Sequence, residues 1–295
     1  MMKTKIMAFI FLTGATFILS CAKKESAETE NTQISIKNKI VAGVPSGALW
    51  DFDATRSDEF NSFDSTKWSN DPLWYDGGVS GKFAYKKANA YVSGGYAHLA
   101  AKKENHQNGT NSYYFRNYTA GCLKSKFEIG ENTYTEISAK LVNHQANVCS
   151  AIWLGDEPAD NKNPNIEIDL HESKEPLTKP DVFNCSLLDW PRPYNPSHPN
   201  NSLGTWFHTE TANLDAGFHT YGVERRAGRL RIFVDELLRF DSNTATFNAG
   251  KTFLPEYITQ LRPLILSIEG HAGDPVDAQL PAELLIDWVH VFKVK

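Results

Sequence analysis

The chain of 295 residues is long enough for one large domain or two smaller ones, and 41% of its residues are hydrophobic. Its 35 acidic residues outnumber its 30 basic ones, which gives a formal net charge of −5. Such a chain lacks the basic surplus with which proteins bind nucleic acids, so we expect no nucleic-acid partner.

The first twenty residues are typical of an export signal. Two lysines precede a mostly apolar run at residues 6–18, which is too short for a membrane span. Residues 18–21 (Ile-Leu-Ser-Cys) are similar to a bacterial lipobox. We therefore predict that residues 1–20 are a lipoprotein signal peptide and that Cys21 becomes the lipidated N-terminus. The protein would be a cell-envelope lipoprotein at the outer membrane, facing the periplasm or the cell surface; the alternative is an ordinary secretory signal with a chance cysteine.

Residues 21–40 are polar and charged, which is typical of a flexible tether, and residues 41–295 are predicted to form one globular domain. That domain contains three cysteines, Cys122, Cys149 and Cys185. A disulfide can form outside the cytoplasm, but an odd number leaves at least one thiol free. The alternative is that all three are small buried residues in strands.

The globular part consists of short apolar or alternating segments between Gly, Pro and Asn turns, with little helical periodicity. This pattern predicts an all-β sandwich of two sheets. A strand, turn and second strand are expected at 91–99, where Gly94 and Gly95 supply positive φ. Further strands are expected at 133–142, 148–154, 182–187, 217–224, 230–235, 263–269 and 282–292.

Two loops carry aromatic side chains. Trp74 lies between Pro72 and a glycine pair, and an exposed tryptophan in a loop is better explained as a platform for a sugar ring than as core. The segment 189–201 is too rich in proline to be a strand. Its Arg192 would suit an anionic group such as a sulfate. A rigid loop without a ligand role is the alternative.

The chemistry of the chain is concentrated at residues 165–173. Strand alternation puts Glu167 and Asp169 on one face and the intervening isoleucines on the other, which must be the core face. Strict alternation would send Glu172 into the core, whereas a β-bulge at residues 170–171 returns it to the acidic face. Repulsion and desolvation should then raise at least one carboxyl pKa. One ionised and one protonated carboxyl group is what cleavage of a glycosidic bond requires. A solvated acidic strand is the alternative.

The spacing Glu167-x-Asp169-x-x-Glu172 resembles the active-site strand of glycoside hydrolase family 16, which includes laminarinases, lichenases, agarases, porphyranases and carrageenases. The resemblance covers about residues 50–293. It implies a concanavalin-like β-jelly-roll sandwich of two antiparallel sheets with an open concave cleft, suited to cutting inside a long polymer. It also implies that Glu167 is the nucleophile, Glu172 the general acid/base and Asp169 the residue that orients and tunes the nucleophile. Configuration would be retained, without an organic cofactor.

The same resemblance assigns substrate contacts. Trp74 looks like the tryptophan that stacks on a galactose unit in agarases and porphyranases. Trp153 is similar to the tryptophan on the cleft floor, one strand from the acids, although a core position is the alternative. Glu269 and His271 lie at the mouth of a strand before a glycine-rich loop and are expected either to contact substrate or to face solvent.

Two further positions concern the opposite side of the domain. Family members often bind a structural calcium there, and the resemblance implies Asp287 and the backbone carbonyl of Gly95 as its ligands.

In the segment 217–224 the family usually has a tryptophan after the glutamate, whereas this chain has Arg225. That departure concerns local packing more than the chemistry.

The resembling segments look most like the branch that acts on red-algal galactans. We therefore expect an agarase or porphyranase, then a carrageenan or furcellaran hydrolase, and then a β-1,3-glucanase. The partners would be a polysaccharide substrate and, through the lipid, a membrane, and we expect a monomer. A surface glycan-binding lipoprotein without catalysis is the rival from another class, although a pure binder has no use for three mutually repelling carboxylates. A purely structural envelope protein would leave the exposed aromatics unexplained.

Overall fold

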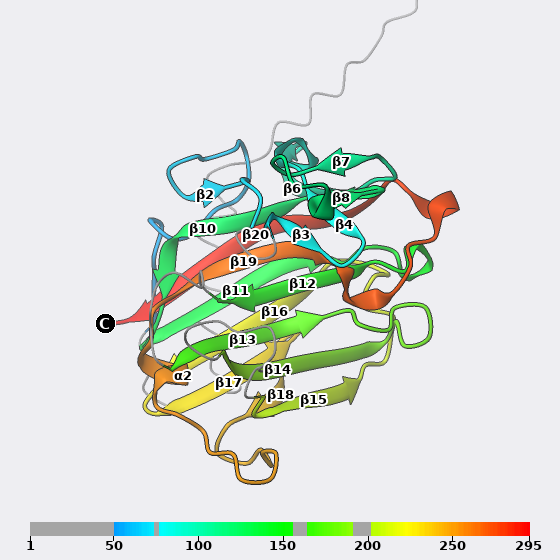
Figure 1. Ribbon diagram of the computed structural model, residues 1–295. Helices are drawn as coiled ribbons and strands as arrows, with labels where there is room; N and C mark the ends of the chain where they lie inside the picture. The colour runs from blue at the N-terminus through cyan, green and yellow to red at the C-terminus, as the bar shows by residue number, and fades with distance from the viewer. Residues whose placement is uncertain (1–49, 74–76, 156–163, 191–201) are drawn as a thin grey trace, which may run out of the picture.

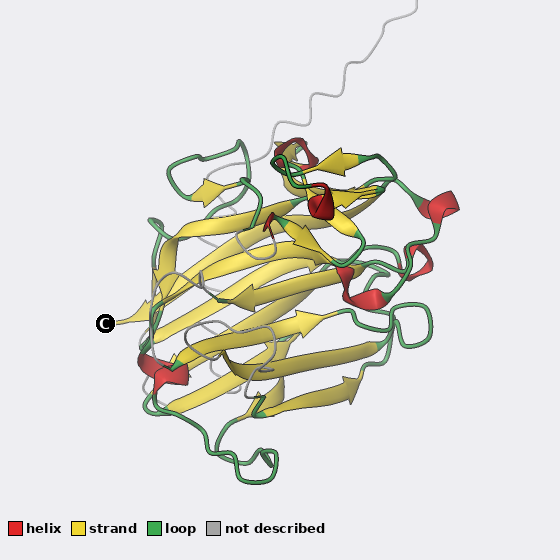
Figure 2. Ribbon diagram, viewed as in Figure 1, coloured by secondary structure: helices red, strands yellow, loops and turns green. Residues whose placement is uncertain are grey.

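The structure, a computed structural model, describes residues 50–73, 77–155, 164–190 and 202–295. Two large antiparallel sheets lie face to face, as Figure 1 and Figure 2 show, which confirms the predicted all-β, concanavalin-like jelly roll. The seven-stranded sheet has the order β15 (Gly204–Thr209), β14 (Val182–Trp190), β13 (Asn165–Glu172), β12 (Cys149–Leu154), β19 (Arg262–Glu269), β10 (Cys122–Ile129) and β2 (Trp68–Ser69).

The second sheet has eight strands. Its order is β18 (Leu237–Asp241), β17 (Arg229–Val234), β16 (His219–Arg226), β11 (Thr133–Lys140), β20 (Ala282–Val294), β6 (Tyr96–Ala101) and β5 (Ala90–Ser93), with β1 (Trp50–Phe52) paired to β20. The turn between β5 and β6 contains Gly94 and Gly95 at φ of 61° and 83°, as predicted.

Smaller strands and helical turns lie outside the two large sheets. A three-stranded sheet contains β3 (Val79–Ser80), β4 (Phe83–Tyr85) and β9 (Tyr118–Ala120), and β7 (His106–Gln107) pairs with β8 (Phe115–Arg116). The helical pieces are η3 (Lys87–Asn89), η4 (Ser112–Tyr114), η5 (His144–Ala146), α2 (Glu256–Thr259), η7 (Gly270–Ala272) and η8 (Asp277–Gln279). Within the described ranges, no helix has the length and apolar character needed to cross a membrane.

The core lies between the two sheets and is built from their inward-facing apolar side chains. Ile168 of β13 and Leu266 of β19 come from one sheet, and Ile137 of β11 comes from the other; all three are fully buried. The three cysteines of the domain are free and buried, so the alternative of small buried residues is confirmed and no disulfide links them.

One expectation about strand limits was wrong. Asp189 and Trp190 belong to β14, not to the proline-rich loop. They pair with Ile166 and Asn165 of β13, and the backbone amide of Asn165 donates to the Asp189 carboxylate at 3.0 Å. Pairing with the neighbouring strand extends β14 up to the first proline, where the ladder loses a donor.

Arg225, the departure from the family pattern, is fully buried in β16. Its guanidinium donates to the carbonyl oxygens of Ile129 at 2.7 Å and Tyr257 at 2.9 Å, and to that of Gln260. Burial, with the charge of the neighbouring Arg262, lowers the pKa of Arg225 to about 9. The side chain therefore ties α2 and the end of β10 to the eight-stranded sheet.

Candidate active site

The predicted β-bulge is present in β13. The register of β13 against β12 slips by one residue between Asp169 and His171, so Leu170 is the extra residue. Leu170 is buried, and the His171 ring stacks in the core against Phe183 and Tyr221, with centroid distances of 5.7 and 5.3 Å. Beyond the bulge, Glu172 returns to the outer face of the seven-stranded sheet.

Two of the three carboxyl groups have raised pKa values. Burial, followed by the charge of Glu172, raises the pKa of Glu167 to about 8, although Trp190 Nε1 donates to Glu167 Oε2 at 3.0 Å and opposes the rise. Asp169 is 4% exposed, and burial together with the charges of Glu172 and Glu167 raises its pKa well above the ordinary value. The three groups are close enough to titrate as a coupled set.

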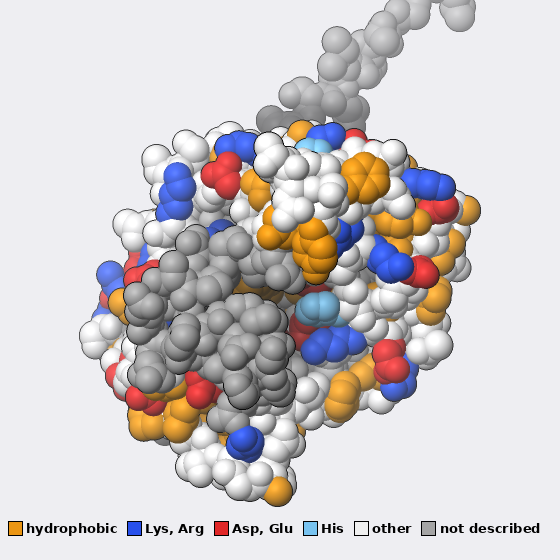
Figure 3. Space-filling model, in the orientation of Figure 1, with side chains coloured by type: hydrophobic (Ala, Val, Ile, Leu, Met, Phe, Trp, Pro, Cys, Tyr) orange, Lys and Arg blue, Asp and Glu red, His pale blue; other side chains and the backbone are white. Residues whose placement is uncertain are grey.

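The pKa of Glu172 is shifted in the opposite direction. Burial disfavours its charge, but His271 Nδ1 lies 2.9 Å from Oε1 and Lys174 Nζ lies 2.6 Å from Oε2. These two contacts outweigh burial and lower the pKa of Glu172 to about 2, while the same hydrogen bond raises the pKa of His271. Figure 3 shows acidic side chains set back in a hollow beside a histidine and a basic residue. Burial therefore favours the protonated forms of Glu167 and Asp169, whereas His271 and Lys174 favour the ionised form of Glu172.

Trp153 lies on β12 directly opposite Asp169, one strand from the acids, and is 7% exposed. Its Nε1 donates to Ser267 Oγ at 3.0 Å. Ser267 and Ser80 in turn donate to the two carboxylate oxygens of Glu269. The position of Trp153 fits a cleft floor, and the hydrogen-bonded chain fixes its ring.

Glu269 needs a correction. The sequence predicts that it contacts substrate or faces solvent, but it is only 4% exposed and its carboxylate accepts hydrogen bonds from two serines. Glu269 therefore holds Ser267, which accepts the hydrogen bond from Trp153. The alternative that Glu269 faces solvent was wrong because one of these serines, Ser80, lies 189 residues away in the sequence. His271 is half-exposed and contacts Glu172.

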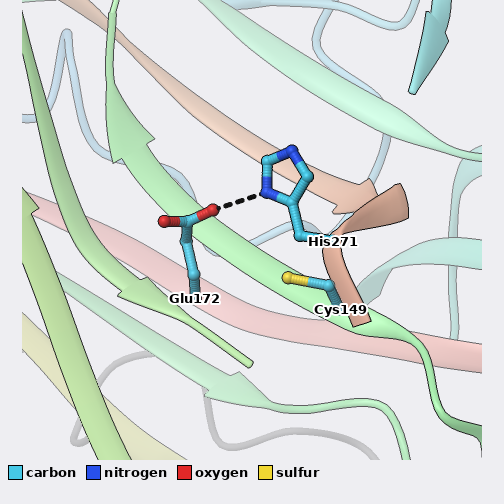
Figure 4. Close-up of side chains that lie close together, drawn as sticks. All are labelled: Cys149, Glu172 and His271. Carbon is cyan, nitrogen blue, oxygen red and sulfur yellow. Dashed lines mark hydrogen bonds and ion pairs between the residues drawn. The ribbon is translucent and has the colours of Figure 1, made fainter. Parts of the chain in front are cut away.

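Cys149, Glu172 and His271 have ligand-type atoms within 4.8 Å of one another (Figure 4). Burial, and then the charge of Glu172, raises the pKa of the Cys149 thiol well above its ordinary value. The ammonium group of Lys174 also already neutralises Glu172.

Several predicted residues lie outside the described ranges, namely Cys21, Trp74 and Arg192. Conversely, sequence reasoning missed Lys174 and Trp190 as neighbours of the carboxyl groups. Lys174 follows Glu172 by two residues, just past the end of β13, and this nearness in the sequence could have identified it. The contact between Trp190 and Glu167 depends on the pairing of β13 with β14.

The predicted calcium ligands lie near one another. Ile286 of β20 pairs with Ala97 of β6, which brings Asp287 beside the turn that contains Gly95. The register of β20 against β11 also slips there, so Asp287 occupies a bulge, which explains a carboxylate in an apolar strand. One carboxylate and one carbonyl supply only part of the oxygen set of about six to eight that calcium takes.

Fold and site together define a concanavalin-like β-sandwich with a cluster of carboxyl groups on the outer face of its seven-stranded sheet. No protein-family model matches the chain. It is 30% identical over 210 residues to a κ-carrageenase from Pseudoalteromonas carrageenovora, a match that covers 64% of this chain and 50% of that enzyme. The chain thus spans about half the length of the curated relative that it matches.

Solved structures share the fold. A κ-carrageenase from Pseudoalteromonas carrageenovora, in complex with a κ-carrageenan oligosaccharide, aligns with a TM-score of 0.63 and 21% identity, over 85% of this chain and 97% of that one. An endo-β-1,3-glucanase from Pyrococcus furiosus has a TM-score of 0.63 and 18% identity, with the same shares. The laminarinase catalytic domain from Thermotoga maritima has a TM-score of 0.63 and 18% identity, over 83% of this chain and 99% of that one.

Proposed function

We propose that the protein is an endo-acting, retaining glycoside hydrolase of family 16 that cleaves β-linked galactans of red algae. The observation that carries the proposal is the bulge in β13, which brings Glu167, Asp169 and Glu172 to one face. Three coupled carboxyl groups with strongly divergent pKa values are costly for a protein that only binds. The similarity to a κ-carrageenase supports the same class.

The resemblance to family 16 assigns a role to each carboxyl group, and that of Asp169 is to orient and tune Glu167. Glu167 attacks the anomeric carbon while Glu172 gives a proton to the leaving oxygen, and ionised Glu172 then activates the water that releases the sugar. Trp190 holds the Glu167 carboxylate from one side at 3.0 Å. The first step needs Glu167 ionised and Glu172 protonated, whereas burial favours the protonated form of Glu167, and His271 and Lys174 favour the ionised form of Glu172. A substrate oxygen that takes over one donor of Glu172 would raise the pKa of Glu172 and favour transfer of the proton from Glu167 to Glu172.

The substrate is proposed at the level of red-algal galactans. The sequence resemblance favours agarose or porphyran, whereas the related κ-carrageenase makes a carrageenan equally well supported. A β-1,3-glucan is the further alternative, because a β-1,3-glucanase shares the fold. Stacking of Trp74 on a galactose unit and binding of a sulfate by Arg192 are part of this proposal, and both residues lie outside the described ranges.

Release of reducing ends tests the proposal. Residues 40–295 would be incubated with agarose, porphyran, κ-carrageenan, furcellaran and laminarin, beside a Glu167→Gln variant. We expect one galactan to be cut, with a rapid fall in viscosity that indicates internal cleavage, and no release by the variant. If no polymer is cut but one retards both proteins equally in an affinity gel, the protein is a glycan-binding lipoprotein instead.

A calcium ion bound by the Asp287 carboxylate and the Gly95 carbonyl is proposed as a structural element. A ligand that binds only the folded state at about 100 times its Kd adds about 2.7 kcal/mol of stability. We therefore expect the Tm to rise by several degrees when calcium replaces EDTA, and this rise to vanish in Asp287→Asn. Equal Tm values of the wild type in calcium and in EDTA would contradict the site. Anchoring to the envelope through Cys21 likewise remains a proposal.

A further inference from the structure

A row of side chains leads across the outer face of the seven-stranded sheet, from the catalytic strand to the edge. Ser186 of β14 lies opposite Asp169, and Asn184, two residues earlier, shares its face. Asn184 pairs with Phe207 of β15, and its side-chain amide donates to the backbone carbonyl of Glu172. Phe207 therefore lies in the same row as Glu172, two strands away. Figure 1 shows β14 between β13 and β15.

Phe207 points away from the core. The neighbouring Trp206 packs inward, with its ring 4.5 Å from that of Phe240 in the opposite sheet and 5.8 Å from that of Phe247. Alternation then sends Phe207 to the outer face, where 65% of its surface is exposed. The ring is therefore accessible to a ligand on the face that carries the carboxyl groups.

A small pocket of about 30 Å³ lies between this ring and Lys174. It lies under the loop that follows β13, and Lys174, Asn184, Pro176 and Phe207 are among the residues that line it. Lys174 lies between the pocket and Glu172. Its ammonium group contacts Glu172 at 2.6 Å, and 39% of its side chain stays exposed. Its remaining donors are thus within reach of a ligand that enters the pocket.

We propose that Phe207 and Lys174 form a subsite for the glycan on the leaving-group side of the cleaved bond, an inference that rests on the proposed function. Glu172 protonates the leaving oxygen, so the departing sugar must lie beside Glu172, where Lys174 contacts the carboxylate and Asn184 leads toward β15. Two strand spacings, about 10 Å, separate β13 from Phe207, which places the ring beyond the first departing unit. The apolar face of a pyranose stacks on Phe207, and Lys174 donates to an oxygen of the adjacent unit.

The test compares two substrates of the full domain. One is the polymer that the wild type cuts, and the other is a nitrophenyl glycoside of its shortest product, whose leaving group does not extend to Phe207. We expect Phe207→Ala to lower kcat/KM about tenfold on the polymer, the equivalent of about 1.4 kcal/mol, and to change it less than twofold on the nitrophenyl glycoside. Phe207→Trp should keep the wild-type ratio of the two values.

Phe218→Ala is the matched control, because Phe218 is also exposed, at 40%, but stacks on Tyr96 at the opposite sheet. It should leave both substrates unaffected. An unchanged polymer rate in Phe207→Ala, or an equal loss on both substrates, overturns the subsite while leaving the hydrolase intact. A wild type that cuts no polymer overturns the proposed function, and the subsite with it.

Discussion

Glu167→Gln is expected to lower kcat on the polymer by roughly 10⁴-fold, equivalent to about 5 kcal/mol of transition-state stabilisation. The amide cannot attack the anomeric carbon, so the loss should be similar on the polymer and on a dinitrophenyl glycoside. Glu172→Gln is expected to lose as much on the polymer but far less on the dinitrophenyl glycoside. That leaving group departs without protonation, so its first step does not need the acid. Initial rates and single-turnover bursts measure both effects.

Glu131→Gln is the control for both variants, because Glu131 is exposed in the turn after β10 and lies outside the site. Unchanged Tm values would show that the active-site variants remain folded. If Glu172→Gln instead lost activity equally on both substrates, Glu172 would be the nucleophile and Glu167 the general acid/base. Such an exchange has a physical basis, since Glu172 is the carboxyl group held ionised by Lys174 and His271.

Arg225→Met is expected to lower the free energy of unfolding by about 3–5 kcal/mol. Methionine fills much of the volume, but the buried carbonyl groups of Ile129, Tyr257 and Gln260 lose their donor. Urea titration measures the change, and calorimetry should show a Tm lower by about 10 °C. The free energy of unfolding of Arg225→Lys should lie between those of the wild type and Arg225→Met, because an ammonium group cannot make all the hydrogen bonds of the planar guanidinium group.

Arg226→Met is the control for this prediction. Arg226 is the next residue of β16 and points to the other face, where its guanidinium lies 5.9 Å from the Trp50 ring. Its loss should cost about 1 kcal/mol or less. Equal destabilisation by the two methionine variants would mean that the carbonyl contacts of Arg225 contribute little to stability.

Much of the fold followed from local pattern. The strands at 91–99, 133–142 and 263–269 were identified because alternation and turn residues are properties of neighbouring residues. The bulge in β13 was also predictable, since only an extra residue reconciles three carboxyl groups with an apolar core face. The strand assignment failed at Asp189 and Trp190, where pairing with β13 extends β14 to the proline.

The sequence by itself determined the all-β class and the face on which Glu167, Asp169 and Glu172 lie. These depend on the two-residue period of a strand, which acts over a few residues. Only the tertiary structure decided what surrounds those acids. His271 reaches Glu172 across 99 residues, and Trp190 reaches Glu167 across 23, because strand order brings β19 and β14 beside the central strands. Strand order is set by the packing of the whole core, so the charge state of each carboxyl group could not be inferred from local spacing.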